Sequence, residues 1–365
     1  MKECRVKDIC IKGSSNLKQK DVEGKKGLYP VYGASGIISS IDTYHQENEY
    51  IAIVKDGSGI GRVSFMPPKS SVIGTMQYIL PKEGYDIRYI GYCLQSLGLN
   101  KYKQGAAIPH IYFRDYGERN IVVSENINEQ RRIVSYLDSS FKLIDEIKNK
   151  ALKSLTEAKA LFQSALAEAM EPKEGWEEKT LGELCSIIGG GTPSKKNSSY
   201  YNGDIPWATV SDMNCDYLQN TICKISDDGV KNSSTQIISK NEVIIATRVG
   251  LGKVCILCQD TAINQDLKGI IPKSDNKLIR KFIFWWFRSK SNYIVSNGVG
   301  ATVKGVKLSF VSNLKISLPT ISTQKQIVSR LDKLSSKVRA IEEKYQKMVE
   351  ECDALKQAML RDVFE

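Results

Sequence analysis

The feature that most constrains the fold is an eleven-residue phrase that occurs twice. NEQRRIVSYLD occupies residues 128–138, and STQKQIVSRLD occupies residues 322–332, at an offset of 194 residues. The same offset aligns the following residues without a gap until Glu171 meets Glu365. A copy this long and this regular indicates a duplicated structural element.

Both copies have the pattern of a long helix. In the second copy, apolar residues recur at alternating spacings of four and three from Ile327 to Met359, which is typical of a coiled coil. No glycine or proline interrupts residues 125–170 or 321–365. Roughly 40 helical residues would extend about 60 Å. We expect the two helices to pair antiparallel, and a homo-oligomeric coiled coil is the alternative. The residues predicted for the coiled-coil seam or for partner binding are Ile133, Leu137, Ile144, Leu155, Ile327, Leu331, Val338, Ile341 and Leu355.

The blocks that precede the two helices are also related, although weakly. IVKDGSGIGRV at 53–63 resembles IIATRVGLGKV at 244–254. GAAIPHIYF at 105–113 and GVGATVKGVKLSF at 298–310 occupy corresponding places before each long helix. Short apolar runs bounded by Gly, Pro, Asn and Asp favour strands. Each block is therefore predicted to contain short strands, glycine-rich turns and one or two helices.

A chain of 365 residues is too long for one ordinary core. The predicted fold class is α+β: two tandem mixed α/β modules, each followed by a long helix, with pseudo-two-fold symmetry. The expected boundaries are 1–124 for the first module, 125–171 for its helix, 172–318 for the second module and 319–365 for the second helix.

The net charge of +11 is confined to the two modules. Residues 1–124 carry a net charge of +5 and residues 172–318 carry +6, whereas both helical segments are close to neutral. Two basic modules separated by neutral helices predict a polyanionic partner, nucleic acid above all. An excess of lysine that only keeps the protein soluble is the alternative.

Composition also suggests a compartment. The chain has no run of about 18 apolar residues, so we expect no membrane span. Its first residues, MKECRVKDIC, lack the apolar region of a signal peptide. Nine cysteines at irregular spacing argue against a secreted disulfide framework. These features predict a cytoplasmic protein.

No motif predicts catalysis or metal binding. KDGSGIGR at 55–62 lacks the spacing of a phosphate-binding loop, and a turn between two strands explains it better. The only histidines are His45 and His110, and Cys255 and Cys258 form a single pair without a second, which is insufficient for a zinc finger. The sequence contains no convincing carboxylate set of a nuclease. The prediction is a non-enzyme.

Two diverged basic modules, each followed by a near-identical long helix, resemble the specificity subunit of type I restriction–modification enzymes. The resemblance covers the whole chain. Its most specific parts are the paired helix openings, the stretch GTPSKKNSSYYNGDIPWATVSDM at 191–213 and LKISLP at 314–319. The first module departs from the pattern, because KGLYPVYGASGI at 27–38 stands where the second has NGDIPWATVSDM at 202–213.

The resemblance implies that each module is a target recognition domain that reads one half of a bipartite, asymmetric site in double-stranded DNA. It implies that the helices space the two halves and dock two DNA adenine methyltransferase subunits, with restriction/translocase subunits added to them. S-adenosylmethionine, ATP and Mg²⁺ would be used by those partners, and this chain would bind no cofactor. A stand-alone DNA nuclease and a structural coiled-coil adaptor are the competing functions.

The candidate DNA-facing residues are polar, basic or aromatic side chains in the predicted turns. In the first module they are Tyr32, Ser35, Lys55, Ser58, Arg62, Gln104 and His110. In the second they are Thr192, Ser194, Lys195, Trp207, Ser211, Arg248, Lys253, Thr302 and Lys304.

Overall fold

The structure is a computed structural model that describes residues 1–57, 59–105, 109–300 and 302–364. Within this described part of the chain, no helix is long and apolar enough to cross a membrane. No peptide bond among these residues is cis.

The chain divides into two compact units, and each contains one module with parts of both long helices. One unit comprises Met1–Leu152 and Lys344–Glu365, and the other comprises Lys153–Glu343. The long helices are α5 (Ile127–Met170) and α10 (Ile321–Phe364), each of 44 residues. The prediction of two long helices, each following a module, is confirmed.

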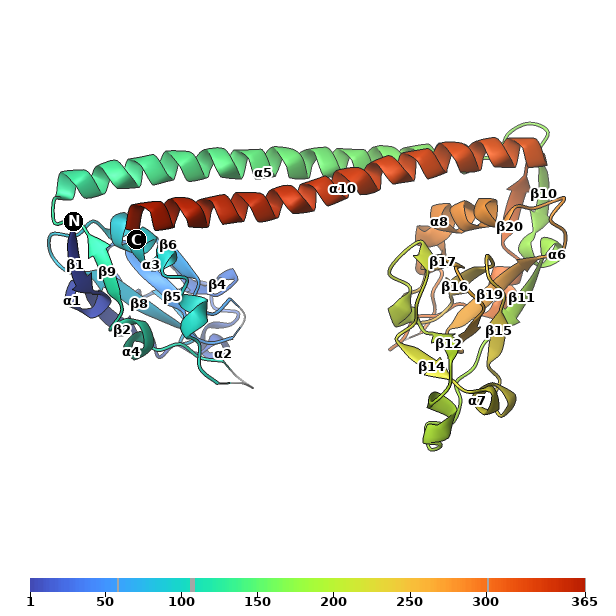
Figure 1. The fold of residues 1–365 in the computed structure, drawn as a ribbon, viewed down its shortest axis with the longest axis horizontal. Coiled ribbons are helices and arrows are strands. Elements are labelled where there is room, and N and C mark those ends of the chain that lie inside the picture. The colour runs from blue at the N-terminus through green and yellow to red at the C-terminus, as the bar shows by residue number, and fades with distance from the viewer. Residues whose placement is uncertain (58, 106–108, 301, 365) are drawn as a thin grey trace. The chain divides into compact units, whose positions relative to one another are not determined.

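The first module contains small sheets and short helices (Figure 1). Its strands are β1 (Lys2–Arg5), β2 (Cys10–Ser14), β3 (Tyr29–Gly33), β4 (Gly36–Ile41), β5 (Tyr50–Val54), β6 (Val63–Met66), β7 (Ser71–Val72), β8 (Met76–Pro81) and β9 (Asn120–Val123). Its helices are α1 (Val6–Ile9), α2 (Gln19–Val22), α3 (Ile87–Ser96), the 3₁₀ helix η1 (Leu99–Tyr102) and α4 (Phe113–Tyr116). The sheet orders are β2-β8-β5-β6, β4-β3-β7 and β1-β9.

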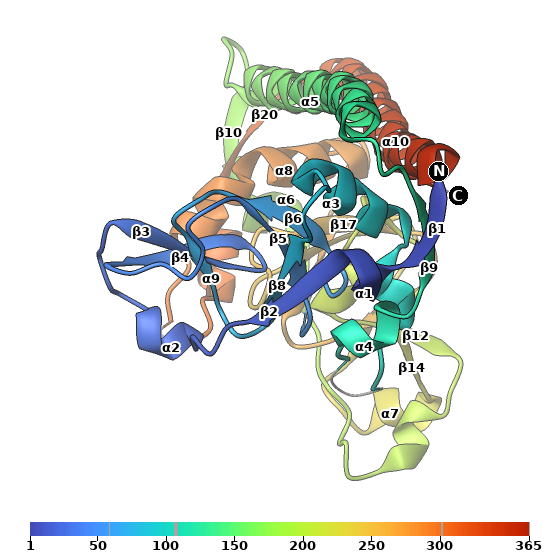
Figure 2. The ribbon, with the colours of Figure 1, turned by 90° about the vertical axis from the view of Figure 1, so that its left-hand side faces the viewer.

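Strand β5 shows how this module is layered. Ile51 and Ile53 pack in the core formed with α3, whereas Tyr50, Ala52 and Val54 pack in a second cluster on the opposite face. Successive side chains of a strand point to opposite faces, so one apolar strand serves both cores. Figure 2 shows α3 beside the β2-β8-β5-β6 sheet. The expectation that short apolar runs form strands is confirmed here.

The second module repeats this plan. Its strands are β10 (Glu177–Thr180), β11 (Cys185–Gly189), β12 (Ile205–Ala208), β13 (Tyr217–Leu218), β14 (Cys223–Ile225), β15 (Gln236–Ile238), β16 (Val243–Ala246), β17 (Val254–Leu257), β18 (Thr261–Ile263), β19 (Leu267–Pro272) and β20 (Lys315–Leu318). Its helices are α6 (Leu181–Leu184), η2 (Ser198–Tyr201), η3 (Val210–Asp212), α7 (Asp227–Lys231), α8 (Arg280–Ser296) and α9 (Leu308–Ser312). The sheet orders β11-β19-β16-β17-β13, β14-β12-β18-β15 and β10-β20 match those of the first module strand for strand, with β13 and β15 added.

Strand β16 has the same two-sided role as β5. Val243 and Ile245 pack in the core that contains α8, and Ile244 packs in the cluster on the other face. Trp285 and Trp286 of α8 are only 2% and 3% exposed. These tryptophans are therefore core residues and offer no surface on which a base could stack.

The parts of α5 and α10 run antiparallel in each unit (Figure 1). The ion pairs are Lys148–Asp353 at 2.8 Å and Asp145–Lys356 at 2.6 Å in the first unit, and Lys159–Glu342 at 2.5 Å and Glu168–Arg330 at 3.5 Å in the second. In both units a higher number on α5 meets a lower number on α10. Exposed pairs of this kind add little stability, but they define the register.

Seven of the nine predicted seam residues are buried or partly buried, and two are not. Leu137, Ile144, Leu155 and Leu331 are buried, and Ile133, Ile327 and Val338 pack against the cores. Ile341 and Leu355 are 37% and 51% exposed, so they are not buried in the seam, and their part in binding a partner stays a prediction. A straight helix turns every 3.6 residues, and a strict heptad stripe drifts out of its contact face. Ser335, which lies outside the predicted stripe, is buried instead.

A buried glutamine joins the first module to α5. Gln130 is fully buried, and its Oε1 accepts a hydrogen bond from the backbone N–H of Asp86 at 2.7 Å, just before α3. Its Nε2 donates to the carbonyls of Ser124 at 2.8 Å and Gly84 at 3.2 Å. The side-chain amide is thus hydrogen-bonded on both its atoms, as burial of a polar group requires.

The repeated glutamine makes the same contacts in the second unit. Gln324 is also fully buried, and its Oε1 accepts from the N–H of Ile279 at 2.9 Å, just before α8. Its Nε2 donates to the carbonyls of Lys277 and Pro319, each at 2.9 Å. We call Gln130 and Gln324 the glutamine anchors.

The repeated aspartate makes the second contact between module and helix. Asp138 accepts hydrogen bonds from Arg88 and Tyr92 of α3. Its counterpart, Asp332, accepts from Lys281 at 2.8 Å and from the indole N–H of Trp285 at 3.0 Å. The hydrogen bond to Asp332 raises the pKa of Lys281. The repeated phrase therefore encodes one mode of attachment, used once in each unit.

Removal of an anchor should destabilise its unit. The variant Gln324→Ala leaves the N–H of Ile279 and two carbonyls without partners in a buried place, so we expect the free energy of unfolding to fall by roughly 2–4 kcal/mol. The measurement is chemical denaturation followed by circular dichroism.

The exposed Gln326, two residues along the same helix, provides the matched control. Gln326→Ala should change the free energy of unfolding by less than about 0.5 kcal/mol. Equal destabilisation by both variants would show that Gln324 has no special structural role.

Candidate nucleic-acid interface

In the second module, a hairpin closes onto the segment that follows β16. Val299 and Gly305 exchange backbone hydrogen bonds at 2.9 and 3.0 Å, and Arg248 forms a bridge with the same Gly305. A Cβ at Gly305 would meet the Arg248 side chain at 2.7 Å, so glycine allows this approach. Thr302 and Lys304 lie within this hairpin. The structure thus brings Arg248 together with a segment more than 50 residues away.

The turn after Arg248 has an unusual backbone. Val249, Gly250 and Gly252 have positive φ angles of 42°, 70° and 89°. Valine rarely adopts this conformation, because its branched side chain clashes with the backbone. Such strain is typical of functional segments. The turn holds Lys253 half-buried with its Nζ 3.2 Å from the Oδ1 of Asn214, whose own amide donates to the carbonyl of Ser211.

A polar run between β18 and β19 connects Thr192 to Arg248. The Thr192 hydroxyl donates to the side chain of Gln265, and the next residue, Asp266, forms an ion pair with Arg248 at 3.7 Å. Lys268 donates to the Gln265 carbonyl at 2.8 Å. Burial lowers the pKa of Lys268, although the nearby Asp266 opposes that shift. Thr192 and Arg248 therefore belong to one polar surface.

Trp207 does not belong to this surface, and its prediction was wrong. The side chain is only 6% exposed and packs with Ile225 and Ala262. Its indole N–H donates to the carbonyl of Gly191 at 3.2 Å. A buried ring is unavailable to DNA. Trp207 instead supports the backbone next to Thr192.

The first module repeats the hairpin with other side chains. His110 exchanges backbone hydrogen bonds with Gln104, both at 2.8 Å, and bridges Asp56 after β5. The His110 Nδ1 lies 2.8 Å from the Asp56 Oδ1. The N–H of Ile111 donates to the Lys55 carbonyl at 2.9 Å. Asp56 and His110 thus occupy the positions that Arg248 and Gly305 occupy in the second module.

The alternating glycines of the first module form the turn between β5 and β6. Gly57, Gly59 and Gly61 have φ angles of 83°, 82° and 81°, which L side chains rarely adopt. The neighbouring Arg62 donates a hydrogen bond to the carbonyl of Ala34. The prediction of a turn between two strands is confirmed, and Arg62 joins this turn to the one between β3 and β4.

The predicted residues fall into three groups by exposure. Those exposed are Ser35, Arg62, Gln104, Ser194, Lys195, Ser211, Arg248, Thr302 and Lys304. Those partly exposed are Tyr32, Lys55, His110, Thr192 and Lys253. Ser58 lies outside the described residues, and Trp207 is buried. Whether any exposed member contacts DNA stays a prediction.

Sequence reasoning missed three residues of these surfaces. Asp56 pairs with His110, Gln265 binds Thr192, and Asp266 pairs with Arg248. A usable signal was the polar triplet Asn-Gln-Asp at 264–266, placed directly between two apolar runs. Among the described residues, no group of three or more His, Cys, Asp or Glu side chains has the arrangement of a metal site.

The two modules share one topology, and each is fixed to a long helix. Each module also presents a turn against a closed hairpin. These features define a class of protein in which a module and its long helix are duplicated. The chain belongs to the family of the type I restriction modification DNA specificity domain, whose model matches residues 1–157 and 173–351.

Curated relatives carry the same description. The chain is 28% identical over 271 residues to the type I restriction enzyme EcoR124I/EcoR124II specificity subunit of Escherichia coli, covering 70% of this chain and 65% of that protein. It is 25% identical over 367 residues to the MjaVIII specificity subunit of Methanocaldococcus jannaschii, covering 89% and 83%. Its match to the MjaIX specificity subunit of the same organism spans only 38% of that protein. The chain thus spans less than two thirds of the length of some relatives.

Solved structures show the same fold. A chain from a study of complex assembly and conformational transition of the type I R-M system superposes with a TM-score of 0.76, covering 98% of this chain and 96% of that one at 18% identity. The HsdS subunit from Thermoanaerobacter tengcongensis gives a TM-score of 0.53 at 18% identity, covering 98% and 95%. At this identity the likeness concerns the fold alone.

The exposed Arg248 gives a direct test of base reading. If its guanidinium contacts a guanine, Arg248→Ala should relax one base position at a cost of about 1–3 kcal/mol. The measurement is binding to a panel of duplexes that differ at single positions. Equal weakening on every sequence, with a shallower salt dependence, would assign Arg248 to a phosphate contact instead.

Proposed function

We propose that this chain is the specificity subunit of a type I restriction–modification system that reads a bipartite, asymmetric site in double-stranded DNA. The observation that carries the proposal is that one framework presents two different sets of side chains. Arg248 pairs with Asp266 in the second module, whereas Asp56 pairs with His110 in the first. Two different sets of side chains on the same framework suit a DNA target whose two halves differ in sequence.

The exposed side chains match the chemistry of base reading. Arginine binds guanine through two donors in the major groove, and glutamine binds adenine with a donor and an acceptor. Arg248 and Gln104 each lie at the hairpin of one module. The Arg248–Asp266 distance of 3.7 Å at an exposed position marks a weak pair, so DNA can displace the carboxylate at low cost. Lysines such as Lys195 and Lys304 suit phosphate contacts.

The proposal includes partners that supply the chemistry. Two DNA adenine methyltransferase subunits would use S-adenosylmethionine, and restriction/translocase subunits would use ATP and Mg²⁺, in the cytoplasm. Exposed apolar side chains on the helices offer docking sites for them. In the first unit Tyr136, Leu143 and Leu355 are 53%, 61% and 51% exposed, and in the second Leu161 is 72% exposed. Large apolar side chains in such positions suit protein contacts.

The competing functions make different demands. A structural coiled-coil adaptor would need the helices and their anchors but not two hairpins with different side chains. A stand-alone nuclease would cleave DNA without a partner. The two experiments below separate these functions from the proposed one.

The purified chain should neither methylate nor cleave DNA by itself. Incubated with DNA, Mg²⁺ and S-adenosylmethionine, it should gain methylation activity only when a methyltransferase partner is added. Transfer of labelled methyl groups and gel analysis of the DNA provide the measurements. Turnover by the highly purified chain alone would contradict the proposal.

The two modules should read their half-sites independently. Replacement of residues 1–124 by another first module should change one half of the methylated motif and leave the other half intact. Sequencing of methylated bases in cells that carry the wild-type or the hybrid chain gives both motifs. A change in both halves would argue against independent readers.

A further inference from the structure

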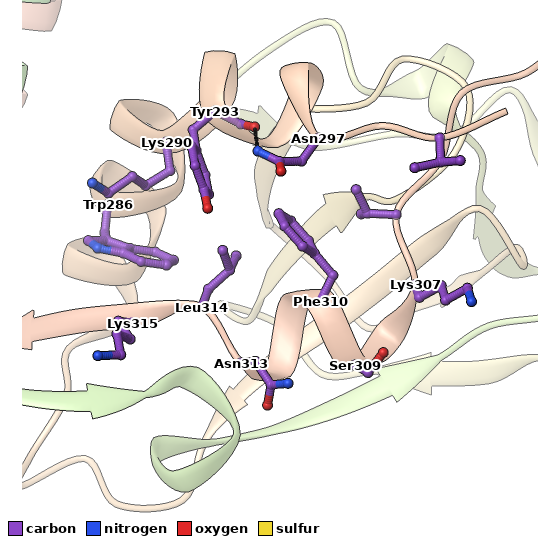
Figure 3. Close-up of a pocket in the computed structure, with 13 residues that line it drawn as sticks. Trp286, Lys290, Tyr293, Asn297, Lys307, Ser309, Phe310, Asn313, Leu314 and Lys315 are labelled. Carbon is purple, nitrogen blue, oxygen red and sulfur yellow. Dashed lines mark hydrogen bonds between the residues drawn. The ribbon is translucent and has the colours of Figure 1, made fainter.

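A pocket of about 700 Å³ lies between α8, α9 and the hairpin of the second module (Figure 3). Tyr293 and Trp286 line it from α8, Phe310 from α9, and Val299 and Gly305 from the hairpin. This volume falls within the usual range for small-molecule sites, about 300–1,000 Å³. None of the residues assigned above to DNA reading lines it.

One side of the pocket is an aromatic wall made by Tyr293 and Phe310. Their ring centroids are 6.2 Å apart and their planes differ by 24°, and Figure 3 shows both rings pointing into the same space. Trp286 is buried at 3% exposure, whereas Tyr293 is 53% exposed. An exposed aromatic ring beside a cavity favours a planar, conjugated ligand, because stacking on it excludes water from both faces.

The charge around the pocket has one sign. Lys290, Lys307 and Lys315 line it, and none of the described residues that line it is Asp or Glu. Lys315 pairs with Glu178 at 2.7 Å. No ion pair involves Lys290 or Lys307 within the part of the chain that the structure describes. Two uncompensated ammonium groups beside an apolar wall favour a ligand with an anionic group.

We propose that this pocket binds a nucleoside phosphate. The base stacks on the aromatic wall of Tyr293 and Phe310, and Lys290 and Lys307 bind the phosphate. Asn297 adds a polar contact at the edge of the base. Its Nδ2 donates to the Tyr293 carbonyl at 2.8 Å, which leaves its Oδ1 to accept a hydrogen bond from an exocyclic amine.

The position of the pocket connects it to the DNA-reading hairpin. Val299 and Gly305 both line the pocket, and they pair with each other through their backbones. Gly305 also forms a backbone bridge with Arg248. An occupant therefore touches the hairpin that carries Thr302 and Lys304. The ligand chemistry is the same for a free nucleotide and for a nucleotide of bound DNA turned out of the helix. Only the second source rests on the function proposed above.

The first arm of the test uses ADP as the probe and isothermal titration calorimetry on the full chain. Adenosine and ribose 5-phosphate should each bind more weakly than ADP, because each supplies half of the interaction. Tyr293→Ala should weaken ADP binding about tenfold, as expected for loss of a stacking ring. Lys307→Ala should weaken it several-fold, with a shallower salt dependence.

Lys231→Ala is the matched control, because Lys231 is an exposed lysine of α7 outside the pocket. It should leave ADP binding unchanged. Tyr293 and Lys307 are both exposed, so their variants should fold, and thermal melting checks this. ADP binding that Tyr293→Ala leaves intact would overturn the proposal.

The second arm identifies the source of the nucleotide. Duplexes with 2-aminopurine at successive positions of the recognised motif report a base that leaves the stack by a rise in fluorescence. The site is assigned to DNA if the fluorescence rises, if Tyr293→Ala abolishes that rise and Lys231→Ala retains it, and if the chain binds no ADP at millimolar concentration. ADP binding without a rise assigns it to a free nucleotide. Absence of both refutes the site, while a methylated motif retained in cells would leave the proposed function intact.

Discussion

A fully buried side-chain amide at the start of each long helix fixes how the rest of each unit is arranged. An amide removed from water must be hydrogen-bonded on both its atoms, or its burial costs several kcal/mol. Gln130 and Gln324 meet this demand only where the loop before α3 or α8 and the end of the last module strand come together. Asp138 and Asp332 then fix the rotation of the helix against the module.

Because of this attachment, some parts of the two modules must have the same structure, whereas other parts can differ between the modules. Strands β5 and β16 keep the same two-sided packing, since a change on either face would open a cavity in a core. The hairpins lie outside those cores. Asp56 with His110 and Arg248 with Asp266 can therefore differ completely in charge, while the backbone bridges that position them are retained. A surface of this kind can diverge without loss of the fold.

The sequence predicted the elements better than the exposure of single residues. The repeated phrase, the apolar strand runs and the glycine turns depend on local pattern, and all were confirmed. The prediction that Trp207 faces DNA was wrong because the local sequence does not show whether an aromatic residue in a polar stretch is buried. Its burial depends on Ile225 and Ala262, which lie elsewhere in the chain. The expected burial of Ile341 and Leu355 in the seam was wrong because a heptad pattern predicts an apolar stripe but not which edge of the stripe meets the partner helix. Asp56 was not predicted because a single aspartate in the sequence does not show that it lies beside His110 in the fold.

By itself the sequence determined the duplication, the fold class, the two long helices and the confinement of positive charge to the modules. These features follow from periodicity and composition, which act over neighbouring residues. The tertiary structure alone decided that the repeated glutamine and aspartate attach each module to its helix. It also decided that Arg248 meets the hairpin at Gly305 and that Tyr293 and Phe310 line a pocket together with Lys290 and Lys307. The physical reason is that hydrogen bonds, burial and charge pairing between distant segments depend on distances that chain order does not specify.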